Sequence, residues 1–92
     1  MPVLAASAVQ EKLATLKNWK LEGEEIVRTL QFPDFPAAIQ FVNKVAEKAE
    51  AAGHHPDIDI RYNKVRLALV SHDAGGLTDA DFNMAAAIDK LA

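Results

Sequence analysis

The sequence contains no cysteine and no excess of basic residues. Without cysteine there can be no disulfide, no thiolate metal site and no thiol nucleophile. The net charge is −3 and the pI is about 5.5, whereas direct binding to nucleic acid requires a basic face that neutralises phosphates. We therefore expect no direct contact with nucleic acid.

Long apolar runs are also lacking, and none approaches the roughly 20 residues that a membrane-spanning helix needs. The first residues, 1–6, have neither the basic flank nor the apolar length of a signal peptide. We therefore predict a cytoplasmic protein that does not bind a membrane.

Two common catalytic motifs are missing as well. Gly75-Gly76 has neither the spacing nor the lysine of a phosphate-binding loop. No serine lies in the G-x-S-x-G context of a hydrolase nucleophile. The chemistry of this protein must be sought in other residue types.

What is present is the composition of an ordinary globular protein, half apolar and one quarter charged. A chain of 92 residues makes one domain, 1–92, with a modest core that oligomerisation would stabilise. The simplest packing is an α+β fold, a four-stranded antiparallel sheet with helices on one face. Hydrophobic periodicity predicts the order α-β-β-α-β-β-α, with elements at 7–17, 19–21, 26–32, 35–52, 57–62, 65–71 and 79–92.

Short polar motifs predict where the helices begin and end. Ser7 and Gln10 have the form of a capping box, Asp34 and Thr78 can cap the second and third helices, and Gly53 can end the second. Each of these two helices carries an apolar stripe. The predicted stripes are Phe35, Ile39, Val42, Val45, Ala46 and Ala49, then Phe82, Ala85, Ile88 and Leu91 or Ala92.

The third and fourth strands read as a hairpin. If its loop is Asn63-Lys64, Tyr62 lies opposite Val65 and the apolar residues of both strands share one face. Continued outward, this register places His55 opposite His72, where the two could act as an acid and a base. It also sets Arg61 against Arg66, which is unfavourable.

All three histidines, His54, His55 and His72, lie in one span between Glu50 and Asp81. Imidazole carries protons in both directions near neutral pH, so this clustering indicates proton transfer. A merely polar surface is the plain alternative, and a zinc site of three imidazoles is another. Glu50 ends a helix, where the dipole disfavours a carboxylate, while Asp81 is a favourable first-turn acid.

The spacing of these residues resembles the signature of the pterin-4a-carbinolamine dehydratase family. It reads Glu50-x3-His54-His55-Pro56-x5-Tyr62-x9-His72-x8-Asp81. The resemblance covers nearly the whole chain, including Leu21-Glu22-Gly23, Tyr62-Asn63-Lys64-Val65 and Gly76-Leu77-Thr78.

The resemblance implies a fold, an assembly and a reaction. The expected fold is the same antiparallel sheet covered by helices, assembled as homodimers or homotetramers through sheet extension and helix packing. The expected reaction removes water from 4a-hydroxytetrahydrobiopterin and gives quinonoid dihydrobiopterin, with no metal or organic cofactor. A reductase then recycles this product for an aromatic amino-acid hydroxylase, which is the expected functional link.

The resemblance also assigns the site. The catalytic histidines fall on His54, His55 and His72, and supporting or substrate-binding roles fall on Glu50, Pro56, Ser71 and Asp81. Our hypothesis makes His54 and His72 the acid–base groups and gives His55 a role in orienting the pterin. Ile58 occupies a position where some members carry a large aromatic residue, so pterin affinity could differ.

Two further functions stay open at this level. Members of the family also act as dimerisation partners of a transcription factor, a protein-binding role that would use a helix surface. Dehydration of a different pterin is the other alternative, because the shape of the pocket cannot be derived from the sequence.

Overall fold

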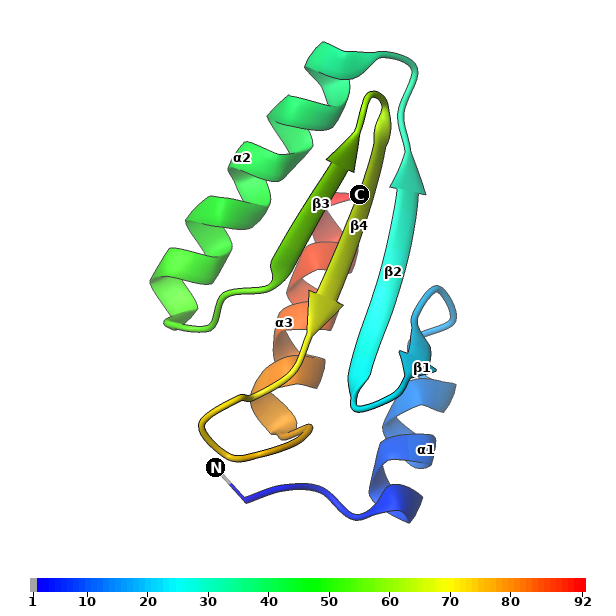
Figure 1. Ribbon diagram of the computed structural model, residues 1–92, viewed down its shortest axis with the longest axis vertical. Helices are drawn as coiled ribbons and strands as arrows, with labels where there is room; N and C mark the ends of the chain where they lie inside the picture. Colours follow the sequence, from blue (N-terminus) through cyan, green and yellow to red (C-terminus); the bar gives the residue numbers. More distant parts are fainter. Residues whose placement is uncertain (1) are drawn as a thin grey trace.

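The computed structural model describes residues 2–92 and contains three helices and four strands. Their order, α-β-β-α-β-β-α, confirms the prediction and can be followed in Figure 1. The elements are α1 (Ala6–Ala14), β1 (Lys20–Glu22), β2 (Glu25–Gln31), α2 (Phe35–Ala52), β3 (Asp57–Arg61), β4 (Lys64–Leu69) and α3 (Asp79–Leu91). No helix of the described residues has the length and apolar character needed to cross a membrane.

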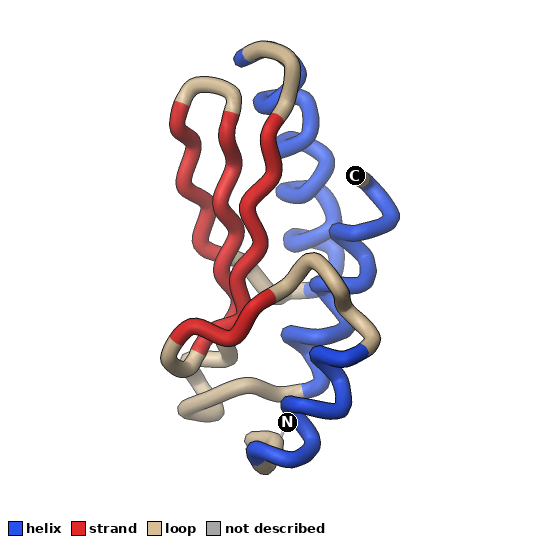
Figure 2. Tube along the Cα trace, turned by 90° about the vertical axis from the view of Figure 1, so that its right-hand side faces the viewer, coloured by secondary structure: helices blue, strands red, loops and turns tan. Residues whose placement is uncertain are grey.

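The four strands form one antiparallel sheet in the order β1-β2-β4-β3. Figure 2 shows the strands on one side of the molecule and the helices on the other, so the helices cover a single face. Alternate residues of the central strands are buried under them, because successive strand residues point to opposite faces. They include Ile26, Leu30, Val65, Leu67 and Leu69.

The β3–β4 hairpin differs from the predicted register by two residues. Its loop is Tyr62-Asn63, so Ile60 rather than Tyr62 lies opposite Val65. The observed register pairs Asp59 with Arg66, where the predicted one opposed two arginines. A shift of two residues keeps every side chain on its face, so the hydrophobic pattern alone could not detect it.

The predicted caps of α2 and α3 are confirmed. Asp34 Oδ1 accepts a hydrogen bond of 2.9 Å from the Ala37 N–H, and Gly53 ends α2 with φ of 65°. Thr78 caps α3, and the Asp81 side chain completes the capping box.

The first helix begins and ends earlier than predicted. It starts at Ala6, its N-cap Ala5 makes no side-chain capping bond, and the predicted capping box of Ser7 and Gln10 is therefore wrong. The extended segment before it is held instead by the Leu4 N–H, which donates to the Leu77 carbonyl at 2.8 Å. The segment before the first turn is thus held by a contact with a distant part of the chain rather than by a local capping motif.

The apolar stripe of α2 is rotated from the predicted one. Its buried residues are Ala38, Phe41, Val45 and Ala49, whereas Phe35 and Ala46 are exposed. Phe41 packs on Phe32 after β2, with ring centroids 5.1 Å apart, a favourable distance for two aromatic rings. The stripe of α3 is closer to the prediction, with Phe82, Ala85 and Ile88 buried together with Met84.

Candidate active site

The three histidines meet at one end of the molecule. There the end of α2, the turn after β4 and the beginning of α3 lie close together (Figure 1). They surround an open pocket of about 520 Å³, a volume that suits a small organic ligand. Its lining residues are Gly53, His54, His55, Val70, Ser71, His72, Asp73, Ala74, Thr78 and Ala80.

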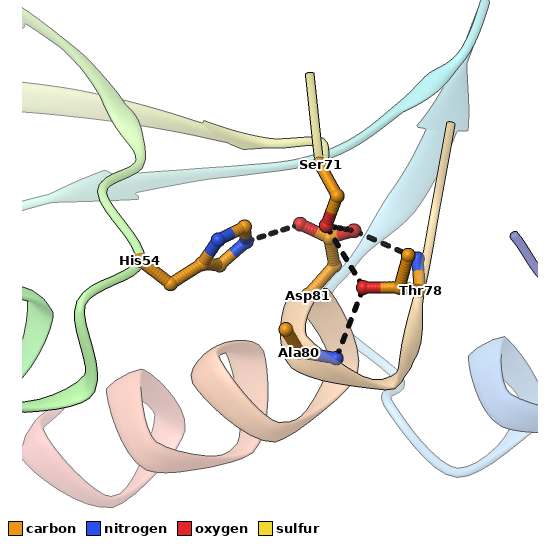
Figure 3. Close-up of polar contacts among 5 residues, drawn as sticks. All are labelled: His54, Ser71, Thr78, Ala80 and Asp81. Atoms are coloured by element: carbon orange, nitrogen blue, oxygen red, sulfur yellow. Dashed lines mark hydrogen bonds and ion pairs between the residues drawn. The ribbon is translucent and has the colours of Figure 1, made fainter. Parts of the chain in front are cut away.

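His54 is held by a buried carboxylate. Its Nε2 lies 2.5 Å from Oδ1 of Asp81, which is fully buried, while the His54 side chain is 18% exposed. Figure 3 shows the imidazole and the carboxylate pointing toward each other from the segment after α2 and the first turn of α3. An ionised carboxylate only accepts hydrogen bonds, so Nε2 presents a hydrogen to Asp81, and in the neutral form of the ring Nδ1 carries the lone pair.

Asp81 has a second task in the fold. Its Oδ2 accepts a hydrogen bond of 2.9 Å from the Thr78 N–H, a donor at the helix start that the helix itself does not satisfy. The same oxygen accepts a hydrogen bond of 2.9 Å from the Ser71 hydroxyl. Asp81 is therefore the predicted first-turn acid and also contacts His54.

His55 has a carboxylate partner of a different kind. Its Nε2 lies 2.5 Å from Glu50 Oε2, but the two side chains are 61% and 79% exposed. Solvent screens this pair, so it fixes the ring less firmly than Asp81 fixes His54. Glu50, in the last turn of α2, thus pairs with the imidazole of His55, although the helix dipole disfavours a negative charge at this end of the helix.

His72 belongs to a turn rather than to a strand. The turn is closed by the Ser71 N–H, which donates to the Gly76 carbonyl at 3.2 Å, and Gly75 takes a positive φ of 83°. The predicted placement of His72 directly opposite His55 is wrong, since the β3–β4 ladder has the other register and ends at Asp57. His72 nevertheless lines the same pocket as His54 and His55.

The remaining predicted residues divide into one inside the site and one beside it. Ser71 lines the pocket and contacts Asp81, whereas Pro56 is buried but does not line the pocket. The sequence indicated Thr78 only as a helix cap, yet its hydroxyl lies 2.8 Å from Ser71 Oγ. Other lining residues that were not predicted, such as Asp73 and Ala74, directly follow His72, and this proximity was the only available signal.

The described part of the chain offers no ligand set for a metal. Among residues 2–92, no three histidine, aspartate or glutamate side chains are grouped so that they could hold a metal ion. His54 and His55 each place Nε2 against a carboxylate, which suits proton transfer by the free ring nitrogen.

Comparison with known proteins gives the family. The family model for pterin 4 alpha carbinolamine dehydratase matches residues 2–91. The chain belongs to this family. Proteins of Acidobacterium capsulatum and Chloroflexus aurantiacus, provisionally named pterin-4-alpha-carbinolamine dehydratases, are 64% and 63% identical over 91 residues. These alignments cover 99% of this chain and 99% and 98% of the two relatives.

Solved structures agree with this assignment. A transcriptional coactivator/pterin dehydratase from Brucella melitensis superposes with a TM-score of 0.93 at 35% identity, covering 98% of both chains. A pterin dehydratase-like protein described as a RuBisCO assembly factor of the alpha-carboxysome has a TM-score of 0.69 at 23% identity. The match covers 80% of this chain and 88% of that protein, and it shows the shared fold only.

Proposed function

We propose that this protein is a 4a-hydroxytetrahydrobiopterin dehydratase that works by histidine acid–base catalysis. The observation that carries the proposal is His54, paired with a buried carboxylate at 2.5 Å in the wall of a pocket that His55 and His72 also line. Family membership supports a pterin carbinolamine as the substrate class. The product, quinonoid dihydrobiopterin, would be reduced and returned to an aromatic amino-acid hydroxylase.

The reaction asks for two proton transfers and no redox change. The bond from C4a to its hydroxyl oxygen breaks while the oxygen takes a proton and leaves as water. A ring nitrogen loses its proton, and its electron pair forms the new double bond to C4a. General acid and base groups positioned for such steps typically contribute about 10²–10⁴ in rate.

The three histidines would share these steps. His54 and His72 serve as the acid–base groups, with Nδ1 of His54 as the atom that exchanges the proton. His55, paired with exposed Glu50, orients the pterin. Because the ring nitrogens of His54 are set by a buried partner, its role is the more sharply defined.

The lining of the pocket favours an unphosphorylated pterin. Among the described residues that line it there is no lysine or arginine, whereas Asp73 contributes a carboxylate. A phosphate-bearing pterin would lack a cationic partner in this lining, and phosphate recognition relies on such groups. This argues for biopterin over phosphorylated pterins, while the alternative of a different, unphosphorylated pterin stays open.

The test follows the decay of freshly generated 4a-hydroxytetrahydrobiopterin by its ultraviolet absorbance. We expect wild-type protein to accelerate the decay, and His54→Ala and His72→Ala each to lower kcat by about 10²–10⁴. Glu11→Gln, on the exposed surface of α1, serves as a control that keeps full activity. Full turnover in both histidine variants would contradict the assignment of these groups.

A second candidate function is a protein-binding role. The Brucella melitensis structure is described as a transcriptional coactivator as well as a pterin dehydratase. Such a role would use a protein surface, so a His54→Ala/His55→Ala/His72→Ala variant would keep it. If folded wild-type protein left the pterin decay unchanged, this candidate would replace the dehydratase.

Self-association is part of the proposal. β3 is an edge strand whose outer backbone groups can pair with a second strand, and Ile58 on it is exposed. We propose a homodimer or homotetramer formed through this edge and through helix packing, as in the family, which sedimentation measurements would test.

A further inference from the structure

A chain of hydrogen bonds leads from the cap of α3 to His54. Thr78 Oγ1 lies 2.8 Å from Ser71 Oγ, Ser71 Oγ lies 2.9 Å from Asp81 Oδ2, and Asp81 Oδ1 lies 2.5 Å from His54 Nε2 (Figure 3). Thr78 and Asp81 are both buried in the structure. No buried side-chain nitrogen or oxygen among the described residues is left without a hydrogen-bond partner.

The direction of every bond in this chain is fixed. A carboxylate only accepts, so the Ser71 hydroxyl must donate its hydrogen to Asp81. Its lone pair is then free to accept from the Thr78 hydroxyl. Thr78 Oγ1 can donate there because it accepts from the Ala80 N–H at 3.2 Å and keeps its own hydrogen.

From this chain we infer that Thr78 and Ser71 are positioning residues for His54. Together with the Thr78 N–H they hold the Asp81 carboxylate so that Oδ1 faces the imidazole. This orientation keeps the hydrogen of His54 on Nε2 and leaves Nδ1 as its proton-accepting atom. The catalytic meaning rests on the proposed function, whereas the hydrogen-bond arrangement does not.

A helix cap alone does not account for these contacts. At α2, the Asp34 side chain accepts from the Ala37 N–H, and this single bond supplies the cap. At α3, the capping hydroxyl has a further hydroxyl partner from the turn after β4, and the first-turn acid contacts a histidine. Ser71 takes no part in capping by itself, so its donation to Asp81 serves the carboxylate.

The experiment measures the tautomer of His54 by long-range proton–nitrogen NMR of histidine-labelled protein. The signals are assigned with His54→Gln, and the spectra are recorded at a pH where the ring is neutral. We expect wild type to carry the hydrogen on Nε2. Thr78→Val and Ser71→Ala should each give a measurable population of the tautomer with the hydrogen on Nδ1. Thr78→Ser, which keeps the hydroxyl, should give the wild-type spectrum.

The matched control is Asp34→Ala, which removes a helix cap at the other end of α2 from the site. It should lower the unfolding temperature and leave the His54 signals unchanged. In the dehydration assay, Thr78→Val and Ser71→Ala should lower kcat by about tenfold and leave KM within about twofold. Loss of an outer residue that orients a functional side chain typically lowers activity by about this factor, as is known for the residues around metal ligands.

Each outcome decides one question. Unchanged His54 signals in folded Ser71→Ala would overturn the inference whether or not the protein dehydrates a pterin, and so would an equal shift in Asp34→Ala. If Thr78→Val did not fold, Ser71→Ala would still test the inference, because Ser71 is not the helix cap. If the tautomer shifted in the Thr78→Val and Ser71→Ala variants while the wild-type protein showed no dehydratase activity, the proposed function would be wrong and the inference would stand.

Discussion

Asp81 contacts both the start of a helix and a histidine of the candidate site. One carboxylate oxygen receives the Thr78 N–H at the start of α3, and the other faces His54 at 2.5 Å. A first-turn acid is favoured by the helix dipole whatever else it does. At this residue the capping contact and the contact with His54 are therefore both present, and the functional role stays a prediction.

Substituting Asp81 should separate the two tasks. In Asp81→Asn the amide oxygen can still accept at the Oδ2 position, but the amide NH₂ would face His54 Nε2 and move the ring hydrogen to Nδ1. We expect kcat to fall by about 10²–10⁴, with a stability loss of about 1 kcal/mol. Asp81→Ala should cost about 2 kcal/mol or more, because it leaves buried donors unpaired.

The measurement combines initial rates with denaturant unfolding of the same samples. Asp81→Asn with wild-type kcat would show that the tautomer of His54 does not matter for turnover.

At the level of single residues, the sequence indicated which histidines lie together but not the contacts that surround them. The clustering of His54, His55 and His72, and the family spacing, indicated the residues that now line one pocket. The hydroxyl contact of Thr78 with Ser71 could not be predicted, because it depends on how the turn 71–76 folds back on α3. Sequence patterns of caps describe only neighbours along one helix.

At the level of elements, the β3–β4 hairpin shows what periodicity leaves undetermined. The predicted and observed registers differ by two residues and keep the same faces, so hydrophobic alternation favours neither. The observed one pairs Asp59 with Arg66 and lets Asn63 Nδ2 donate to the Phe32 carbonyl at 2.8 Å. The contact with the end of β2 favours the observed register. Cross-strand charge does not decide it, because Arg61 lies opposite Lys64.

The same hairpin contains a strained residue. Tyr62, the first residue of its loop, has a positive φ of 54° and is 68% exposed. Tight two-residue loops require such a φ, which glycine adopts without cost. We expect Tyr62→Gly to be more stable than Tyr62→Ala by about 1 kcal/mol, since both lose the ring and only alanine keeps the strain.

Thermal unfolding of the two variants measures this difference. For a chain of this size it corresponds to a higher midpoint by about 4–8 °C for Tyr62→Gly. Equal midpoints would mean that the backbone of the loop is not strained.

At the level of the whole molecule, a polar cluster far from the histidines joins the sheet to the last helix. Asp89 Oδ1, near the end of α3, accepts from Trp19 Nε1 at 2.9 Å and from Arg28 Nη1 at 2.5 Å. Trp19 is buried and the side chains of Arg28 and Asp89 are mostly buried. These residues are distant in the sequence, so no periodicity could have paired them, whereas the α+β class and the element order followed from periodicity and local motifs.

Removing this carboxylate should destabilise the protein. Asp89→Ala leaves the indole N–H and the guanidinium without their acceptor, and we expect a loss of about 1–3 kcal/mol in the free energy of unfolding. Lys12→Ala, which breaks the exposed pair of Lys12 with Asp79, should change it by less than about 1 kcal/mol. Fluorescence of Trp19, the single tryptophan, reports unfolding directly. Equal stability of the two variants would contradict a role for Asp89 in joining the layers.

The double task of Asp81 also constrains how such proteins can diverge. If the protein catalyses the proposed dehydration, a descendant that lost it could replace His54, His55 and Glu50, but its last helix would still need an acceptor for the Thr78 N–H. An acid at this position would then persist long after the chemistry had gone. The carboxylate alone is therefore a poor marker of activity in a relative, and the pair of His54 with Asp81 is the informative one.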